Sequence, residues 1–482
     1  MSRDGRPERR EPDEAGGGPE AGEPLSEREA AERALLADTD WLAEADRVFD
    51  ELMERTGEGL PEPRLHATRR AVELLGEVHR AAPVIHIAGT NGKSSTARIT
   101  GALLQAAGLR TGVFTSPHVE RLAERIEIDG EPVSDERLAA NWDEIAPLLE
   151  IVDRELAEAG EPRLTFFEAL TVLAFACFAD APVDVVVLEA GIGGEWDSTN
   201  VADGAVAVFT PVALDHMARL GGTIAEIART KAGIVKPAAR VVSAAQPPEA
   251  LAELERAARL QEAPLELVGR DVVLERNEPE GASRLLTIRT PRARYEELLL
   301  PLRGEHQGEN AALAVATVEA FLGGEPLSPQ LVAQGLLRAR SPGRLQRIGR
   351  TPPVLVDAAH NPHGAAALAA SIGGAVAHER LVVVLGVLDD KDAEGVVRAL
   401  DPVAAEFVAV ASDSPRAVDA FELAGRIAEW TGREPAAFDR VDEGLEHARL
   451  LAAGGGAVLV TGSITVIGEA VRIMRETEGR HD

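Results

Sequence analysis

The chain has 482 residues, which is too long for one ordinary core and predicts two or three domains. Its formal net charge of −30 repels backbone phosphates, so we expect no nucleic-acid partner. No apolar run approaches the ~20 residues of a membrane helix, no signal core is present, and the single cysteine excludes an intramolecular disulfide framework. We therefore expect a cytoplasmic protein that does not enter a membrane.

Strand and helix patterns alternate through the first part of the chain. Residues 1–38 are rich in Glu, Gly, Pro and Arg without apolar periodicity, which predicts a disordered acidic tail. The alternation beyond it favours an α/β fold with a mainly parallel sheet and helices on both faces. Helices are predicted at 39–57 and 94–107, and strands at 84–88, 113–115, 183–188, 205–210 and 240–243.

The pattern changes at residues 265–303, where short alternating segments predict a small antiparallel excursion. Predicted helices at 310–322 and 329–338 close this domain, and the Ser-Pro-Gly-Arg segment at 341–344 predicts a hinge. A second, smaller α/β domain is predicted from strands at 354–357, 381–385, 407–411 and 458–461 and a helix from Gly364. The predicted organisation is a tail at 1–38, a larger domain at 39–340 and a smaller one at 341–482.

A glycine-rich turn between a predicted strand and a predicted helix is the sharpest local signal. It reads Gly89, Thr90, Asn91, Gly92, Lys93, Ser94 and Ser95. Small residues let backbone N–H groups approach phosphate oxygens, and the helix N-terminus adds positive potential. Lys93 can reach the β- and γ-phosphates, and a hydroxyl of Ser94 or, with a one-residue shift, of Ser95 can bind Mg²⁺. The alternative is a turn that only caps the helix, with Lys93 in solvent.

Polar side chains follow two further predicted strands. Glu189 ends the strand at 183–188 and precedes a glycine turn, and Asp215-His216 follows the strand at 205–210. The carboxyl ends of parallel strands meet at one edge of a sheet, so these groups should converge with the phosphate loop. Taken alone, Glu189 is more simply a solvated loop residue and His216 a structural histidine. For Lys231 the pattern alone favours a surface charge.

Fourteen motifs occur in one order and spacing from about residue 40 to the C-terminus. They are the glycine-rich turn and segments 115–118, 124–126, 164–168, 189–194, 197–200, 214–216, 231–234, 304–307, 310–311, 342–345, 357–362, 390–392 and 461–463. Together they resemble folylpolyglutamate synthase/dihydrofolate synthase, of the Mur ligase superfamily. The resemblance implies a larger N-terminal P-loop ATPase domain, a smaller Rossmann-like C-terminal domain and a site between them.

The resemblance also implies roles for individual side chains. Lys231 would be carbamylated, which turns a cation into an anionic metal ligand and replaces the surface interpretation. The other implied contacts are magnesium for Ser116, Glu189 and His216; adenine for Asn310; the phosphates for Arg344; the ribose for Asp357; the incoming amino acid for His360 and Ser412; and the pterin side for Thr165, Phe166, Phe167 and the loop 116–125. Lys93, His216, Lys231, Arg344 and His360 are the predicted catalytic residues.

Two positions depart from the pattern of the family. Ser94 stands where members often have glycine, and Thr230 stands where the residue before the lysine is commonly Glu. The first change should be tolerated, whereas the second removes a carboxylate from the surroundings of Lys231.

The resemblance implies an ATP- and Mg²⁺-dependent ligase that joins L-glutamate to dihydropteroate or to a folate through an acyl phosphate. A carboxylate is a poor electrophile at neutral pH, so ATP must activate it. A monovalent cation is a further cofactor expectation, and we expect a monomer. The alternatives are a peptidoglycan-type Mur ligase, which normally carries an N-terminal domain for its nucleotide-sugar carrier, and a non-catalytic ATP-binding regulator.

Overall fold

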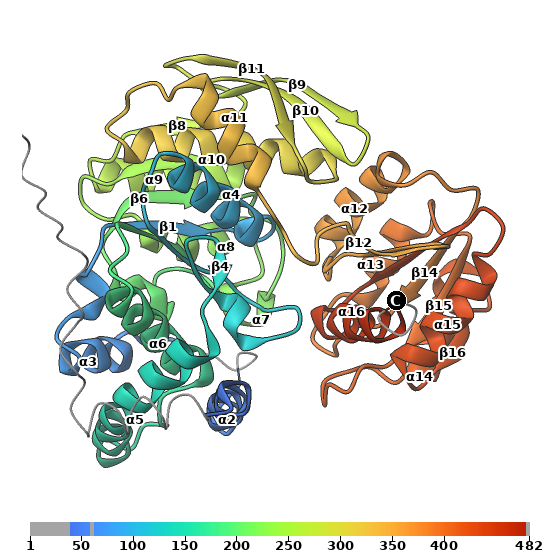
Figure 1. The fold of residues 1–482 in the computed structure, drawn as a ribbon, viewed down its shortest axis with the longest axis horizontal. Coiled ribbons are helices and arrows are strands. Elements are labelled where there is room, and N and C mark those ends of the chain that lie inside the picture. Colours follow the sequence, from blue (N-terminus) through green and yellow to red (C-terminus); the bar gives the residue numbers. More distant parts are fainter. Residues whose placement is uncertain (1–38, 58–61, 479–482) are drawn as a thin grey trace, which may run out of the picture.

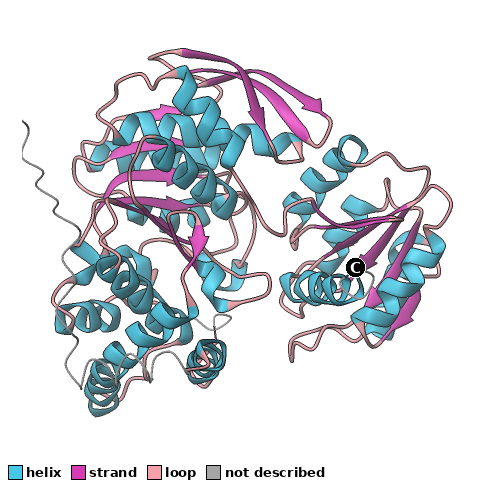
Figure 2. Cartoon of the chain, in the orientation of Figure 1, coloured by secondary structure: helices cyan, strands magenta, loops and turns pink. Residues whose placement is uncertain are grey.

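Three β-sheets organise the part of the chain that the computed structural model describes, residues 39–57 and 62–478 (Figure 1). An eight-stranded and a six-stranded sheet each lie between helices, and a three-stranded sheet lies at the top of the view (Figure 2). The predicted α/β class, with a larger and a smaller sheet, is confirmed. The predicted tail at 1–38 lies outside the described residues.

The eight-stranded sheet supplies the first half of the site. Its strands are β1 (Val84–Ala88), β2 (Thr111–Phe114), β3 (Ile126–Ile128), β4 (Glu131–Pro132), β5 (Val185–Glu189), β6 (Gly204–Phe209), β7 (Arg240–Ser243) and β8 (Leu265–Leu267). The strand order is β4-β3-β2-β5-β1-β6-β7-β8. Each pair of neighbours from β2 to β8 in this order is parallel, whereas β3 pairs antiparallel with both β2 and β4. Strands β1 and β5 are buried along their whole length, which explains their continuous apolar runs.

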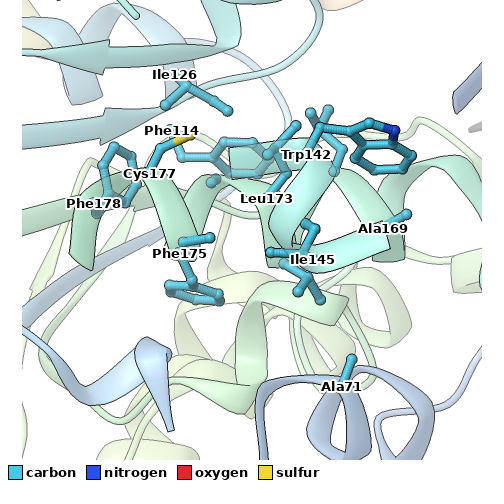
Figure 3. Packing of buried hydrophobic residues seen from close by; sticks show 14 of the residues in the cluster. Ala71, Phe114, Ile126, Trp142, Ile145, Ala169, Leu173, Phe175, Cys177 and Phe178 are labelled. Atoms are coloured by element: carbon cyan, nitrogen blue, oxygen red, sulfur yellow. The ribbon is translucent and has the colours of Figure 1, made fainter. Parts of the chain in front are cut away.

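Helices cover both faces of this sheet. They are α2 (Trp41–Met53), α3 (His66–Leu74), α4 (Lys93–Ala106), α5 (Asp135–Glu158), α6 (Phe166–Asp180), α7 (Met217–Leu220), α8 (Ile224–Lys231), α9 (Pro248–Leu260), α10 (Glu305–Phe321) and α11 (Pro329–Arg338), with 3₁₀ turns η1 (Val78–Arg80), η2 (Leu122–Arg125), η3 (Ser198–Val201) and η4 (Ala232–Ile234). Helices α4, α10 and α11 pack on one face, and α2, α3, α5 and α6 on the other. Figure 3 shows part of the core under α2, α3, α5 and α6, with Phe114, Trp142, Phe175 and Cys177.

The three-stranded sheet confirms the predicted antiparallel excursion. It consists of β9 (Val273–Glu280), β10 (Ser283–Arg289) and β11 (Arg294–Leu300), each paired antiparallel with the next. The prediction that 265–267 belong to this excursion is wrong. These residues form β8, which pairs parallel with β7 and extends the large sheet.

The second domain is built on the six-stranded sheet. Its strands are β12 (Gln346–Arg350), β13 (Pro353–Val356), β14 (Leu381–Leu385), β15 (Glu406–Val410), β16 (Ala436–Phe438) and β17 (Ala457–Thr461), and its helices are α12 (Pro362–Ala375), α13 (Ala393–Leu400), α14 (Ala420–Thr431), α15 (Val441–Leu451) and α16 (Ile464–Glu478). The order is β12-β13-β17-β14-β15-β16, and only β12 is antiparallel to its neighbour. The four predicted strands are confirmed to within one residue.

The two domains meet through a linker and several surface contacts. The linker joins α11 to β12, and it contains the predicted hinge at 341–344. Val119, from the loop after β2, packs against the core of the C-terminal domain. A Cβ atom at Gly468 would lie 2.2 Å from the Val119 carbonyl oxygen, so α16 approaches this loop very closely. Glu120 forms an ion pair with Arg475 of α16.

In the described part of the chain, no helix combines the length and the apolar character that crossing a bilayer requires.

A buried polar group joins the three-stranded sheet to α10. The Tyr295 hydroxyl donates to Glu319 Oε1 at 2.6 Å and accepts from the backbone N–H of Leu327 at 2.9 Å. The Glu319 carboxylate is buried, and burial raises its pKa. One phenolic oxygen therefore serves both partners, and Glu319 Oε1 also accepts from Thr290 Oγ1 at 3.0 Å.

We predict that Tyr295→Phe lowers the free energy of unfolding by about 1–3 kcal/mol, because a buried carboxylate and a buried N–H each lose a partner. Urea denaturation followed by circular dichroism measures this change. The substitution preserves ring packing, so an unchanged unfolding midpoint would show that the hydroxyl makes no net contribution.

Candidate functional site

The glycine-rich turn joins the end of β1 to the start of α4, as predicted. Gly89 has a φ of 151°, and a Cβ atom there would lie 1.9 Å from Thr210 Oγ1 and 2.9 Å from the Thr210 carbonyl oxygen. The backbone N–H of Thr90 donates to the Pro211 carbonyl at 2.9 Å. The turn is therefore seated on the end of β6, and its position requires glycine at 89.

Glu189 lies at the end of β5, beside the first turn of α4. It is 1% exposed, which excludes the solvated interpretation. Its Oε1 accepts from Ser94 Oγ at 3.1 Å, its Oε2 accepts from the Ser116 N–H at 3.2 Å, and Lys93 Nζ lies 4.0 Å from Oε1. Burial raises the pKa of this carboxylate, and Lys93 opposes the rise. The predicted convergence of phosphate loop and acidic strand end is thus present.

The two hydroxyls that follow Lys93 point in different directions. Ser94 Oγ lies between the Glu189 carboxylate and the Ser116 carbonyl, which is 3.4 Å away. Ser95 Oγ is 2.8 Å from Ser341 Oγ in the linker, and it accepts from Gln307 Nε2 at 3.3 Å. Only Ser94 therefore faces the carboxylate.

Lys231 ends helix α8 inside the protein. It is 4% exposed, so the surface interpretation is wrong. Its ammonium group donates to the Gly89 carbonyl at 2.7 Å. Burial, assisted by Lys93, lowers the pKa of Lys231 to about 7. At Thr230, where a Glu is common, the hydroxyl donates to the Glu226 carbonyl at 3.3 Å.

Asp215 and His216 form a tight turn after β6. His216 has a φ of 50°, in the left-handed region, and its N–H donates to Asp215 Oδ1 at 2.8 Å. Burial lowers the pKa of His216 to about 4, with Asp215 opposing and Lys391 and Lys93 adding to the shift. The imidazole is therefore neutral near pH 7, which is the form that can bind a metal ion.

The C-terminal domain reaches this turn with three side chains. Lys391 Nζ donates to Asp215 Oδ1 at 3.1 Å, Asn361 Nδ2 donates to Asp215 Oδ2 at 3.0 Å, and His360 Nε2 lies 3.4 Å from Oδ2. Asn361 also pairs with Asn91 of the phosphate loop, with N–O distances of 3.1 and 3.3 Å. The two domains therefore touch at the phosphate loop and at the His216 turn.

Sequence reasoning missed the roles of Asp215, Asn361 and Lys391 in this contact. In the sequence, Asp215 was considered only as the neighbour of His216, and Asn361 and Lys391 only as parts of longer motifs. The available signal was that polar residues follow β6, β13 and β14, whose carboxyl ends face the space between the sheets.

The predicted nucleotide-side residues lie beside the linker and the loop. Asn310 is buried, and its Oδ1 lies 2.7 Å from where a Cβ of Gly92 would be. Both Asp357 oxygens accept from backbone N–H groups, those of Leu345 and Ala359, at 2.9 Å. Arg344 Nη1 donates to the Gly343 carbonyl at 3.4 Å.

A further residue near these groups, His306, was also missed. Its Nδ1 is buried without a hydrogen-bond partner among the described residues. Burial lowers its pKa, while Asp357 opposes the shift and Arg344 reinforces it.

The residues expected on the pterin side are mostly packed in the N-terminal domain. The Thr165 hydroxyl accepts from the Glu168 N–H at 3.3 Å and caps α6. The Phe166 ring is buried with the Arg125 guanidinium 5.3 Å from its centre, whereas Phe167 is partly exposed and lies 5.7 Å from Phe114. Their pterin role stays a prediction.

Ser412, expected near the incoming amino acid, takes part in a chain of hydroxyls. Its Oγ lies 2.8 Å from Thr465 Oγ1, which is 2.7 Å from Ser463 Oγ. His360 instead lies beside the Ala358 carbonyl and Asp215, so the role of Ser412 toward the amino acid also stays a prediction.

The donor set around Glu189 suits a hard cation that is shared with phosphate. Within the described ranges, no three His, Cys, Asp or Glu side chains form a complete metal cage. Mg²⁺ usually binds through one or two carboxylates together with waters and substrate phosphates, and does not require such a cage. The buried Glu189 carboxylate and the Ser94 hydroxyl beside it fit this requirement.

We predict that Gly89→Ala weakens ATP binding at least about tenfold, or roughly 1.4 kcal/mol, because the new Cβ collides with Thr210. Titration calorimetry with ATP measures the affinity. Gly108→Ala is the matched control, since Gly108 also has a positive φ but meets no heavy atom within 4 Å. Equal affinities for the two variants would contradict the seating of the turn on β6.

Comparison with family models assigns both domains. A model described as the Mur ligase middle domain matches residues 87–318. A model described as the Mur ligase glutamate ligase domain matches residues 343–464. The first match ends within α10 and the second begins in the linker, and together they cover the phosphate loop, Glu189, the Asp215–His216 turn and their C-terminal partners.

Known relatives match most of the chain. The dihydrofolate synthase/folylpolyglutamate synthase of Mycobacterium tuberculosis is 41% identical over 397 residues, 80% of this chain and 82% of that protein. The structure of Mycobacterium tuberculosis folylpolyglutamate synthase complexed with ADP has a TM-score of 0.87 at 38% identity, over 90% of this chain and 99% of that one. Escherichia coli FolC in complex with DHPP and ADP gives 0.76 at 31% identity, over 88% and 95%. The chain therefore belongs to the dihydrofolate synthase/folylpolyglutamate synthase family of Mur ligases, enzymes that use ATP to attach glutamate to folates.

Proposed function

We propose that this enzyme carries out both reactions of the family, adding L-glutamate to dihydropteroate and to folates that already bear glutamate. The observation that carries the ligase chemistry common to both reactions is the convergence of Lys93, Glu189 and Lys231 at one sheet edge, near Asp215 and its C-terminal partners. The double name of the Mycobacterium tuberculosis relative supports the pairing of activities.

The proposed reaction has three steps: phosphoryl transfer, attack by the amine and loss of phosphate. A carboxylate oxygen of the acceptor attacks the γ-phosphorus of ATP, and ADP leaves with the bond electrons. The glutamate amine then attacks the acyl phosphate carbonyl, and the tetrahedral intermediate expels phosphate to leave an amide and release a proton. Positioning and charge neutralisation are the main requirements of phosphoryl transfer. Lys93 and Arg344 are proposed to supply positive charge, and closure of the C-terminal domain excludes water from the acyl phosphate.

The metal site is proposed to use Glu189, Ser94, Ser116, His216 and a carbamylated Lys231. Magnesium, when bound there, neutralises charge on the triphosphate. A pKa of about 7 leaves much of the Lys231 amine neutral at physiological pH, and the neutral amine is the form that reacts with carbon dioxide. Carbamylation removes a buried positive charge beside Lys93 and replaces it with an oxygen donor.

The remaining contacts are proposed from the positions of the side chains. Asn310 and Asp357 lie on the nucleotide side, for adenine and ribose, and His360 and Ser412 in the second domain are assigned to the incoming glutamate. Thr165, Phe166 and Phe167 are assigned to the pterin side. A monovalent cation, a monomeric state and a cytoplasmic location complete the proposal; the single, buried Cys177 suits a reducing compartment.

Product analysis tests the function directly. The protein is incubated with ATP, Mg²⁺ and glutamate, and with either dihydropteroate or tetrahydrofolate, and products are identified by mass spectrometry. We expect each acceptor to gain glutamyl residues, with one ADP and one phosphate released per addition. With ¹⁸O in the acceptor carboxylate, one label should appear in the released phosphate. Glutamylation of only one acceptor would reject the dual activity, and unlabelled phosphate would reject the acyl phosphate.

The two serines after Lys93 should differ in their effect on the metal requirement. We predict that Ser94→Ala raises the Mg²⁺ concentration for half-maximal ADP release about tenfold, the scale on which partners of a metal site act. Ser95→Ala should leave this concentration unchanged, because Ser95 contacts the linker. Glutamate-dependent ADP release at varied Mg²⁺ measures both, and the opposite ranking would assign the metal to Ser95.

A further inference from the structure

The Asp215 side chain, in the large domain, contacts the predicted metal ligand His216 and three side chains of the small domain. Its Oδ1 accepts from Lys391 Nζ at 3.1 Å, and its Oδ2 accepts from Asn361 at 3.0 Å and lies 3.4 Å from His360. The side chains of Asp215 and Lys391 are 10% and 9% exposed. A nearly buried ion pair thus spans the two domains.

Asp215 Oδ1, which accepts a hydrogen bond from Lys391, also stabilises the His216 turn. Asp215 Oδ1 accepts from the His216 N–H at 2.8 Å. His216 has a left-handed φ of 50°, a conformation that is unfavourable for a non-glycine residue and persists only where its surroundings fix it. The backbone turn that carries the imidazole is therefore held by an oxygen that the other domain also binds.

We propose that Asp215 is a positioning residue that makes the placement of His216 depend on closure of the C-terminal domain, with Lys391 as the group that transmits closure. The proposal rests on the magnesium role proposed for His216. When the domains are apart, Asp215 lacks Lys391, Asn361 and His360, and the carboxylate that holds the His216 turn is no longer fixed by the other domain. When they meet, the carboxylate is fixed from the far side, and the imidazole is held in place.

Asn361 extends the same coupling to the phosphate loop. Its amide donates to Asp215 and also exchanges hydrogen bonds with the Asn91 amide. The loop that binds phosphate and the turn that carries His216 therefore share one C-terminal partner. Closure acts on both at once.

Metal binding tests this coupling without relying on turnover. Full-length protein is loaded with the non-hydrolysable ATP analogue AMPPCP, and Mn²⁺ binding is measured by electron paramagnetic resonance. We expect Lys391→Met to raise the Kd for Mn²⁺ about tenfold, the scale reported for groups that orient metal ligands. The affinity for AMPPCP in EDTA should stay within about twofold, because the ammonium group of Lys391 is directed to Asp215 and Asp390.

Three further variants separate coupling from other causes. Arg475→Met removes the Glu120–Arg475 ion pair, which also joins the domains but does not reach His216, and it should leave the Kd for Mn²⁺ unchanged. Lys391→Arg keeps the charge and should restore part of the affinity. Asp215→Asn combined with Lys391→Met should be no weaker than the weaker single variant, because both act through one contact.

Each outcome decides the question. If Lys391→Met raises only the KM for glutamate and leaves Mn²⁺ binding unchanged, Lys391 contacts the amino acid and the proposal fails. If Lys391→Met does not fold, as judged by circular dichroism, Lys391→Arg and Asp215→Asn decide it by the same Mn²⁺ measurement. If the unaltered protein with AMPPCP takes up no Mn²⁺, the proposed metal role itself fails, and the coupling proposal falls with it.

Discussion

Burial of charge beside the phosphate loop is the constraint on which the rest of the site depends. Lys93, Glu189 and Lys231 lie close together with little access to water. Isolated buried charges are strongly unfavourable, and they persist where partners compensate for the lost solvation. Here the compensation within the chain is incomplete, since Glu189 receives two neutral donors and a lysine 4.0 Å away. A nucleotide and a cation that arrive together would complete it.

The two domains have separate apolar cores but share the site. Each domain has its own apolar cores, and those of one domain are separate from those of the other. The site, in contrast, takes residues from both sheets, and its connecting contacts are largely polar, as between Asp215 and Lys391. Interfaces of this kind permit relative motion of domains. The large domain can therefore keep its phosphate loop in place while the small domain moves to complete the surroundings of that loop.

Much of the fold could be predicted from the sequence because buried parallel strands are continuous apolar runs. Strand β14 was predicted with the observed bounds for that reason. Strand β12 was missed because its sequence, Gln346–Arg350, is polar and contains glycine, and β16 because it has three residues. Helix α10 begins before the predicted position, at Glu305, because its first turn lacks apolar periodicity.

The site was less predictable than the fold. The local pattern around Lys93 and Glu189 indicates phosphate and metal chemistry, since both follow buried strands. Spacing could not decide between Ser94 and Ser95, because that depends on which side of a helix start faces Glu189. The burial of Lys231 depends on helix packing against a distant loop, and the partners of Asp215 lie more than a hundred residues away.

The close approach of α16 to the loop after β2 restricts what position 468 can hold. With the carbonyl of Val119 only 2.2 Å from where a Cβ would stand, even alanine would have to push the helix and the loop apart. Val119 packs at the edge of the C-terminal core, so such a change would disturb how the two domains fit together. The side chains that position 468 can accept are therefore limited by assembly of the two domains as well as by the folding of either one.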